Sequence, residues 1–592
     1  MRIQFLFTAV ITALLCTTAS AGPASPVPFT YVQPDGSVIR LQKHGDEYFH
    51  WTTLAGTKQV MALGEDGWWR PAVFDDSAWR AGQKRRMEVN DRRQRDGILR
   101  NRRPLKGASG PSVPKELHFP ILLLEFPDRP FTVEDPLNWF DSMLNRPGYS
   151  VNGATGSVRD YFQYNSSGAF IPVFDLYGPV TLPENAAYYA ASMLSGSEIA
   201  LIQGARLLDD QIDFTQYDAD RDGDVDVLFF IFAGYSSSEK EHSSKTHLWP
   251  NTGFVIHNDK FDGIPLDIGG CTSELFGSGP AGISTFCHEF SHALGLPDFY
   301  PTGSLAEFVN GEMYEFSLMC SGNWLNDGIS PPSLTALERI WLGWMSEEDV
   351  REFPDGEVSF GSISGNVAYR NNTDNEGEYF IFECRDGSGW DSYLPEGMLV
   401  YHVDQSGTVL SNGKTAGSLW QYGRQSSSTN SIPGHPCCYV VPAGHQSWDY
   451  YNETDRSKFV FPGSLSVTSY SPMAWGNCST GLNLSDIRYD EADKKVHLTV
   501  SRHQDTSTSL ADMGFNAIAD PGNGQYAAGS TLPLQLELAA GSEPQSVSWT
   551  FDGYALTGTD PLTLQPGLHT LMAVLRYADG STETLELALD VK

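Results

Sequence analysis

Apolar residues in the middle of the chain occur in two patterns, as continuous runs and as repeats at helical spacing. Residues 117–126 and 225–232 are continuous apolar runs, which are typical of strands buried on both faces. Residues 157–162 carry a helix-capping pattern, and residues 283–294 repeat apolar side chains at helical spacing without Pro or Gly. The order strand, helix, strand, helix predicts an α/β domain whose last helix packs against a sheet.

Both flanks of this region are predicted to be rich in strands. A Pro-Asp-Gly turn between apolar runs predicts a hairpin within residues 31–41. Residues 378–384 and 397–404 are predicted strands, whereas residues 410–434 are rich in Ser, Gly, Asn and Thr and predict a loop. Short strands at regular spacing in residues 521–592 are typical of an immunoglobulin-like sandwich.

The length, net charge and N-terminal segment of the chain limit the class of protein. A length of 592 residues predicts several domains, and a formal charge of −34 disfavours nucleic acids and anionic membranes as partners. Arg2, a following apolar run and the triplet Ala19-Ser20-Ala21 predict a signal peptide over residues 1–21. No later stretch is apolar enough to cross a bilayer, so we expect no transmembrane segment and a protein secreted to the extracellular space or periplasm.

Seven cysteines follow the predicted signal peptide, and export would permit disulfides. The odd count leaves at least one thiol unpaired if the others pair, and the pairing itself does not follow from the sequence. Cys287 falls on the apolar stripe of the predicted helix over residues 283–294, which favours a core position over a ligand role.

The candidate chemistry lies at the end of that helix. His288 and His292 are four residues apart, so both imidazoles stand on one face and can bind one metal ion. Glu289 lies beside the first histidine, where it can act as general base toward a metal-bound water. Gly295 can reverse the chain and bring Asp298 back toward the histidines. Two nitrogens, one carboxylate and an open fourth position predict a catalytic zinc site.

Simpler interpretations of these residues stay open at this point. A buried helix with two hydrogen-bonded histidines would carry the same motif, although the Gly and Asp at matching offsets argue against a chance occurrence. Met319, within residues 317–323, is a candidate Met-turn residue that would form an apolar floor beneath the zinc without binding it. An ordinary core methionine would be buried in the same way.

The string His288-Glu289-x-x-His292-x-x-Gly295-x-x-Asp298, together with Met319, resembles the metzincin arrangement of zinc peptidases. Metzincins commonly have a third His where this chain has Asp298. The longer string over residues 288–300 is most similar to the immune-inhibitor-A-like family of secreted zinc metalloproteases, and the similarity extends over roughly residues 28–500. The resemblance implies a secreted endopeptidase that is made with a pro-segment.

An acidic loop precedes the second buried strand. Its alternating carboxylates and Gly223 match the first half of an EF-hand calcium loop. Position twelve would be Phe229 instead of Glu, and the predicted strand replaces the second helix, so the loop is not an EF-hand. A calcium site and a solvated acidic turn both fit, because clustered carboxylates repel one another unless a cation or water lies among them. The candidate ligands are Asp218, Asp220, Asp222, Asp224 and Asp226.

A basic run separates the N-terminal β-rich region from the first buried strand. Residues 84–106 hold ten Lys or Arg and three acidic residues. A solvated linker and a processing region, cut by a trypsin-like protease or by the enzyme itself, both fit this run. We expect residues 22 to about 110 to fold against the catalytic domain and block its cleft, because their tryptophans need a partner surface. The alternative is an ordinary N-terminal domain that stays attached.

These observations predict a multidomain protein with an α/β metzincin-like zinc protease domain, followed by β-sandwich domains and preceded by a small N-terminal pro-segment. The expected order is a signal peptide (1–21), a pro-segment with its basic processing linker (22–115), the catalytic domain (116–350), a β-rich domain (351–502), and a linker with an immunoglobulin-like β-sandwich (503–592). The predicted function is a secreted zinc-dependent endopeptidase that hydrolyses peptide bonds of proteins through a zinc-activated water, with Glu289 as general base.

Two alternatives accompany this prediction. A zinc-dependent exopeptidase or other hydrolase would need a group that captures a substrate terminus, and no sequence feature points to one. A catalytically inactive, protease-like adhesin would bind glycan or protein through its β domains and would have no need of Glu289. Protein or peptide substrates are predicted, while the cleavage preference and the oligomeric state are left open.

Overall fold

The computed structural model describes most of the chain, in two compact units. The first unit comprises Met1–Thr468 and Asp486–Thr499, and the second comprises Ser469–Ser485 and Val500–Lys592. The described residues are 18–20, 23–25, 27–46, 49–64, 66–81, 116–191, 195–219, 221–239, 246–255, 257, 259–301, 312–423, 429–430, 432, 434–446, 454–475, 478–502, 525–526, 531–532, 545–551, 554–556, 562–564, 567–576 and 582–591.

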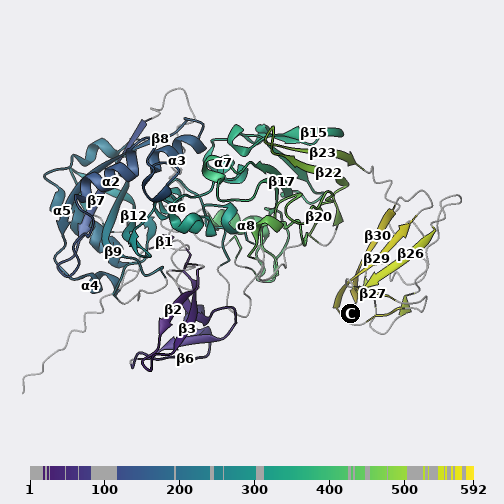
Figure 1. Ribbon diagram of the computed structural model, residues 1–592, viewed down its shortest axis with the longest axis horizontal. Coiled ribbons are helices and arrows are strands. Elements are labelled where there is room, and N and C mark those ends of the chain that lie inside the picture. The colour runs from purple at the N-terminus through teal and green to yellow at the C-terminus, as the bar shows by residue number, and fades with distance from the viewer. Residues whose placement is uncertain are drawn as a thin grey trace, which may run out of the picture. The chain divides into compact units, whose positions relative to one another are not determined.

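A mixed sheet with four parallel strands lies at the left of Figure 1, within the first unit. In spatial order its main strands are β1 (Thr18–Ser20), β10 (Asn251–Phe254), β12 (Ile264–Phe276), β9 (Val225–Tyr235), β7 (Glu116–Glu125) and β8 (Ile171–Thr181); the short β11 (Lys260–Phe261) and β13 (Gly279–Pro280) pair with β12. The four strands β12, β9, β7 and β8 are parallel, whereas β10 and β1 are antiparallel at one edge. The two predicted strands of this region, now β7 and β9, are confirmed.

Helices cover both faces of this sheet, as the α/β prediction requires. One face carries α2 (Pro136–Asn145), α3 (Val158–Asn165) and α6 (Ser284–Ala293), and the other carries α4 (Ala186–Ala190) and α5 (Ser195–Leu208). Alternate side chains of β7 enter the two cores, since Ile121 belongs to the same buried cluster as Phe290 of α6 and Leu122 to the same cluster as Leu201 of α5. The predicted capping box at the start of α3 is present. This packing fixes α6, which carries the candidate chemistry, against the sheet.

A second group of strands follows residue 349. One sheet contains, in spatial order, β14 (Val350–Glu352), β16 (Ala368–Asn372), β17 (Glu378–Arg385), β18 (Gly397–Asp404) and β19 (Cys438–Val440). A three-stranded sheet contains β15 (Gly356–Phe360), β23 (Lys495–Arg502) and β22 (Leu482–Asp490). Helix α7 (Ala336–Leu342) precedes these strands. Helix α8 (Ala416–Gly423) lies where a loop was predicted, because Leu419 and Trp420 are buried in the core despite their Ser- and Gly-rich surroundings.

The hydrophobic core beneath α6 continues into this second group of strands. Ile381 of β17 and Tyr401 of β18 belong to the same buried cluster as Phe286 and Phe290 of α6. A buried ionic network also crosses residue 350. Arg385 pairs with Glu383 and Asp391 and donates to the carbonyl oxygens of Phe316 and Ser333, while Glu383 accepts from the N–H of Ala336.

The N-terminal region forms an antiparallel sheet of five strands. They are, in order, β2 (Phe29–Val32), β3 (Val38–Gly45), β4 (His50–Leu54), β5 (Val60–Leu63) and β6 (Trp69–Pro71). The predicted hairpin is confirmed by the pairing of β2 with β3. Trp51 stacks on His44 and Phe49 within this sheet, so its aromatic residues bury one another to a greater extent than the sequence suggested.

The described part of the second unit consists mostly of strands. One of its sheets has the order β24 (Gln525–Tyr526), β30 (Thr582–Val591), β29 (Gly567–Arg576), β26 (Ser546–Phe551) and β27 (Tyr554–Ala555), and two strand pairs are β25 (Thr531–Leu532) with β28 (Leu562–Thr563) and β20 (Met473–Ala474) with β21 (Cys478–Ser479). Across the described parts of both units, no helix is both long and apolar enough to span a bilayer.

Six of the cysteines are buried free thiols: Cys271, Cys287, Cys320, Cys384, Cys437 and Cys438.

Candidate active site

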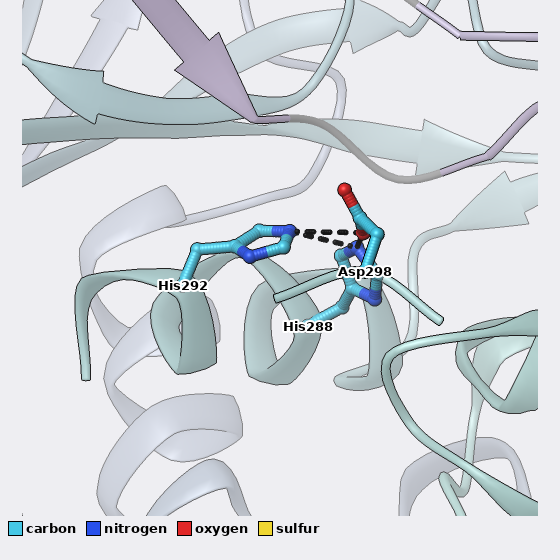
Figure 2. A group of neighbouring side chains, drawn as sticks. All are labelled: His288, His292 and Asp298. Atoms are coloured by element: carbon cyan, nitrogen blue, oxygen red, sulfur yellow. Dashed lines mark hydrogen bonds and ion pairs between the residues drawn. The ribbon is translucent and has the colours of Figure 1, made fainter. Parts of the chain in front are cut away.

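Helix α6 and the turn after it present three side chains to one point (Figure 2). The helix ends at Ala293, and Gly295 follows with φ of 103°, a conformation that glycine adopts at little cost. Its N–H donates to the carbonyl of His292, and that of Leu296 donates to the carbonyl of Ser291. The chain therefore reverses as predicted, and Asp298 returns to the histidines.

The three donor atoms form a nearly equilateral triangle. His288 Nε2 lies 3.2 Å from His292 Nε2, and Asp298 Oδ1 lies 3.3 and 3.2 Å from these two nitrogens. A tetrahedral ion with bonds of about 2.0–2.1 Å separates its ligands by about 3.3 Å. The triangle thus has the dimensions of three corners of such a site, and the two imidazoles and one carboxylate are suitable ligands for a transition metal.

The remaining nitrogen of each imidazole is engaged by the backbone. His288 Nδ1 lies 2.8 Å from the carbonyl oxygen of Leu318, and His292 Nδ1 lies 2.8 Å from that of Leu296. Because a carbonyl only accepts, both Nδ1 atoms carry protons, and a neutral ring then directs its Nε2 lone pair to the shared point. Two lone pairs and a carboxylate would repel one another there unless a cation lies among them, so the residues fit a metal ion.

Burial and charge reinforce this requirement for a positive group. Asp298 is 1% exposed, and neither of its oxygens meets hydrogen-bond geometry with a described group. Burial by itself would raise the pKa of Asp298, but the two imidazoles lower it to about 2. Burial by itself would lower the pKa of His292, whereas the charge of Asp298 raises it to about 9. The carboxylate therefore stays ionised and favours a positive group beside it, either a proton on His292 or a metal ion that takes the place of that proton.

The Met-turn candidate contacts the loop of the third candidate ligand through its backbone. Met319 is fully buried, in the same core cluster as Phe290. Its carbonyl accepts a hydrogen bond of 2.8 Å from the N–H of Phe299, the residue after Asp298. The backbone of this turn thus makes two contacts at the site. The Leu318 carbonyl accepts from His288 Nδ1, and the Met319 carbonyl accepts from the N–H of Phe299. A floor beneath a metal and an ordinary core methionine would both be buried in this way.

Glu289 is fully buried next to the three candidate ligands. Thr252 of β10 reaches it from the sheet, with Oγ1 donating toward the Glu289 carbonyl oxygen at 2.8 Å and lying 3.1 Å from Oε2. Neither Thr252 nor the carbonyls of Leu318 and Leu296 were found from the sequence. The carbonyls belong to the backbone and leave no residue signal, and Thr252 lies on a short strand without a distinctive pattern.

Residues 277–344 match the family model of the immune inhibitor A peptidase M6, catalytic domain. The resemblance to this family is confirmed. The matched segment contains all of the residues singled out in α6 and the turns after it: His288, Glu289, His292, Asp298 and Met319. No curated protein matches the chain.

The match to the M6 peptidase domain supports a protease function, for which proteins or peptides would be the substrates. The M6 family consists of metallopeptidases, which agrees with a metal cofactor at the cluster of His288, His292 and Asp298. The antiparallel edge strand β10 lies beside the helix of this domain. β1 pairs with it so that Ser20 lies opposite Thr252.

The N-terminal sheet contacts the loop that follows β9 of the peptidase region. Lys43 is buried and its Nζ donates to the carbonyl oxygens of Ser237 and Glu239 at 2.6 and 3.0 Å. Lys43 also lies over the ring of Trp249, and His50 packs against the same ring. This docking contact joins the sheet to the segment that leads into β10.

The acidic loop before β9 is partly described, and Asp220 lies outside the described residues. Asp218 accepts from the N–H of Asp222 at 3.0 Å and of Gly223 at 3.1 Å, while Asp226 accepts from that of Ala219 at 2.8 Å. The N–H of Asp224 donates to Asp222 at 3.1 Å. These carboxylates therefore stabilise the turn itself, and calcium binding there stays a prediction.

Proposed function

We propose that this protein is a secreted zinc-dependent endopeptidase. The observation that carries the proposal is the convergence of His288, His292 and Asp298 on one point, with Glu289 beside them, inside the segment that matches the M6 peptidase family. A zinc ion held by these three side chains would supply Lewis acidity, both for activating water and for polarising the scissile carbonyl.

The chain's own residues have separate roles in this proposal. The backbone carbonyls of Leu318 and Leu296 hold both histidines with Nε2 available to the metal. Glu289 takes the proton of the attacking water and returns it to the leaving amine. Glu289 is fully buried with residues 18–20 in place, and surroundings of low dielectric constant strengthen the electrostatic interactions of its carboxylate.

The edge strand β10 supports endopeptidase over exopeptidase activity. In the structure this edge already pairs with an extended segment, residues 18–20, and the pairing places Ser20 opposite the threonine that contacts Glu289. A substrate that adds to β10 in the same way would be held by backbone hydrogen bonds, which do not depend on a free terminus. Residues 18–20 belong to the predicted signal peptide, so its removal would leave the edge open.

The N-terminal sheet is proposed to act as a pro-segment that is released by cleavage in the basic linker. Its docking through Lys43 onto residues 237–239 supports this role, because those residues lead toward β10. The linker, residues 84–106, lies outside the described residues. Secretion and calcium binding by the acidic loop complete the proposal.

The decisive experiment is metal analysis and digestion of an internal peptide blocked at both termini, with the mature form beside Glu289→Ala. Cleavage inside the peptide by a zinc-loaded protein, absent in the variant, is the expected result. Cleavage only of peptides with a free terminus would indicate an exopeptidase. Zinc binding without any hydrolysis would favour the inactive adhesin.

A further inference from the structure

Thr252 makes a bifurcated approach to a single residue of α6. Its Oγ1 lies 2.8 Å from the main-chain oxygen of Glu289 and 3.1 Å from Oε2 of the same residue. Thr252 is 3% exposed and Glu289 is fully buried in the chain that includes residues 18–20. The side chain of Glu289 is thereby linked to its own backbone through one hydroxyl group from another element.

The position of Thr252 is set by the sheet. In the ladder of β10 with β12, Thr252 pairs with Gly270 and Asn251 pairs with Cys271. The side chain of Asn251 donates to the carbonyl of Trp249 at 2.7 Å and contacts Ser197 of α5 at 3.1 Å. The hydroxyl of Thr252 therefore approaches α6 from a backbone that is fixed on both sides, whereas a free glutamate side chain rotates about three bonds.

We propose that Thr252 is a positioning residue that orients the carboxylate of Glu289 toward the attacking water. This inference rests on the proposed function, in which Glu289 is the general base. A hydroxyl suits the task because it can donate to a carboxylate or accept from a carboxylic acid, and so can bond to Glu289 before and after the proton is transferred. An apolar side chain of the same shape can do neither.

The test compares Thr252→Val, which keeps the shape and loses the hydroxyl, with Thr252→Ser, which keeps the hydroxyl. The matched control is Thr272→Val, at another buried threonine, on the neighbouring strand β12. We expect Thr252→Val to lower kcat by about tenfold or more, with KM within about twofold of wild type, because orientation of the base affects the transition state more than substrate binding. Thr252→Ser should recover most of the rate, and all variants should bind as much zinc as wild type.

A double-mutant cycle separates positioning from a general structural effect. If Thr252 acts through Glu289, Thr252→Val should have no further effect on the residual rate of Glu289→Ala. Wild-type kcat in Thr252→Val, equal losses in the Val and Ser variants, or a full additional loss in the Glu289→Ala background would each overturn the inference. If Thr252→Val does not fold, Thr252→Ala is measured in the same cycle.

Different results would overturn the proposed function and the role of Thr252. An inactive wild-type enzyme, or a Glu289→Ala variant with substantial activity, would overturn the proposed function itself. An active wild type with an inactive Glu289→Ala and an unaffected Thr252→Val would overturn only the role of Thr252.

Discussion

The Nδ1 atom of His288 lies 2.8 Å from the carbonyl oxygen of Leu318, the residue immediately before Met319. The carbonyl of Met319 in turn accepts from the N–H of Phe299, next to Asp298. One turn of the backbone therefore fixes the ring of the first candidate ligand and the loop of the third. This arrangement gives the Met-turn segment a structural role that does not depend on the methionine side chain.

Replacing Glu289 with Ala should leave the bound zinc in place and lower the hydrolysis rate at least about a thousandfold, because the base and the ordered water are lost together. Zinc content by atomic emission and turnover of a blocked peptide are the two measurements. Substantial residual proteolysis in the zinc-loaded variant would show that another group acts as base.

Asp298→Ala should lower zinc affinity, and Asp298→His should partly restore it, since imidazole is also a competent third ligand. Zinc affinity is measured by competition with a chelating dye. The matched control is Asp327→Ala, at a turn residue of the same matched segment. Unchanged affinity in Asp298→Ala would mean that the third ligand lies elsewhere.

Removing calcium while zinc is kept saturated should lower the melting temperature, because the carboxylates of the acidic loop would lose their cation. Asp222→Asn should be less sensitive to calcium than the parent. The readout is the shift in melting temperature on adding calcium to the zinc-loaded protein. A melting temperature that does not depend on calcium would favour the solvated acidic turn.

The intact chain should be less active than a form that begins near Lys115, because the docked N-terminal sheet would block the site. The uncut Glu289→Ala protein is treated with trypsin or active enzyme, and the cuts are mapped while the activities of intact and shortened wild-type forms are compared. Equal activities, or no preferred cut between residues 84 and 116, would contradict latency.

Docking of the N-terminal sheet should strengthen as the pH rises from about 8 toward 10. Burial lowers the pKa of Lys43 from its usual 10.5 to about 8, although Glu239 opposes this. Between pH 8 and 10 the docked state therefore binds fewer protons than the undocked state, so a rise in pH favours docking. Below pH 8 Lys43 is charged in both states, and the free-energy cost of burying its charge is then greatest. His50, whose pKa burial lowers to about 4, stays neutral throughout.

Lys43→Met is the control for this pH dependence, because it keeps an unbranched side chain and removes the titrating group. The melting temperature of the uncut wild type, taken relative to this variant, should rise between pH 8 and 10. A constant difference across that range would contradict the role of Lys43.

The sequence predicted the elements of the site better than the contacts between them. The spacing of His288 and His292 required a helix, and α6 was found there because its apolar stripe fills the core beneath the sheet. The approach of Asp298 followed from Gly295, since few other residues reverse a chain with positive φ. These are local properties, which a single stretch of residues can specify.

What the sequence could not give were the contacts between distant segments. Thr252 reaches Glu289 only because β10 lies antiparallel at the edge of the sheet, and nothing near residue 252 records that arrangement. The helix α8 was missed for the opposite reason. Its Ser- and Gly-rich composition favours a loop, whereas burial of Leu419 and Trp420 in the shared core stabilises a helix.

The hydrophobic core that is shared across residue 350 limits where the chain can be divided, by evolution or by cloning. A fragment that ended there would leave Phe299 and Trp341 without the ring of Trp420 and deprive Ala336 of its bond to Glu383. Gene fusions, truncated expression clones and natural recombination would therefore preserve the fold around α6 only when they carry β17, β18 and α8 along with it.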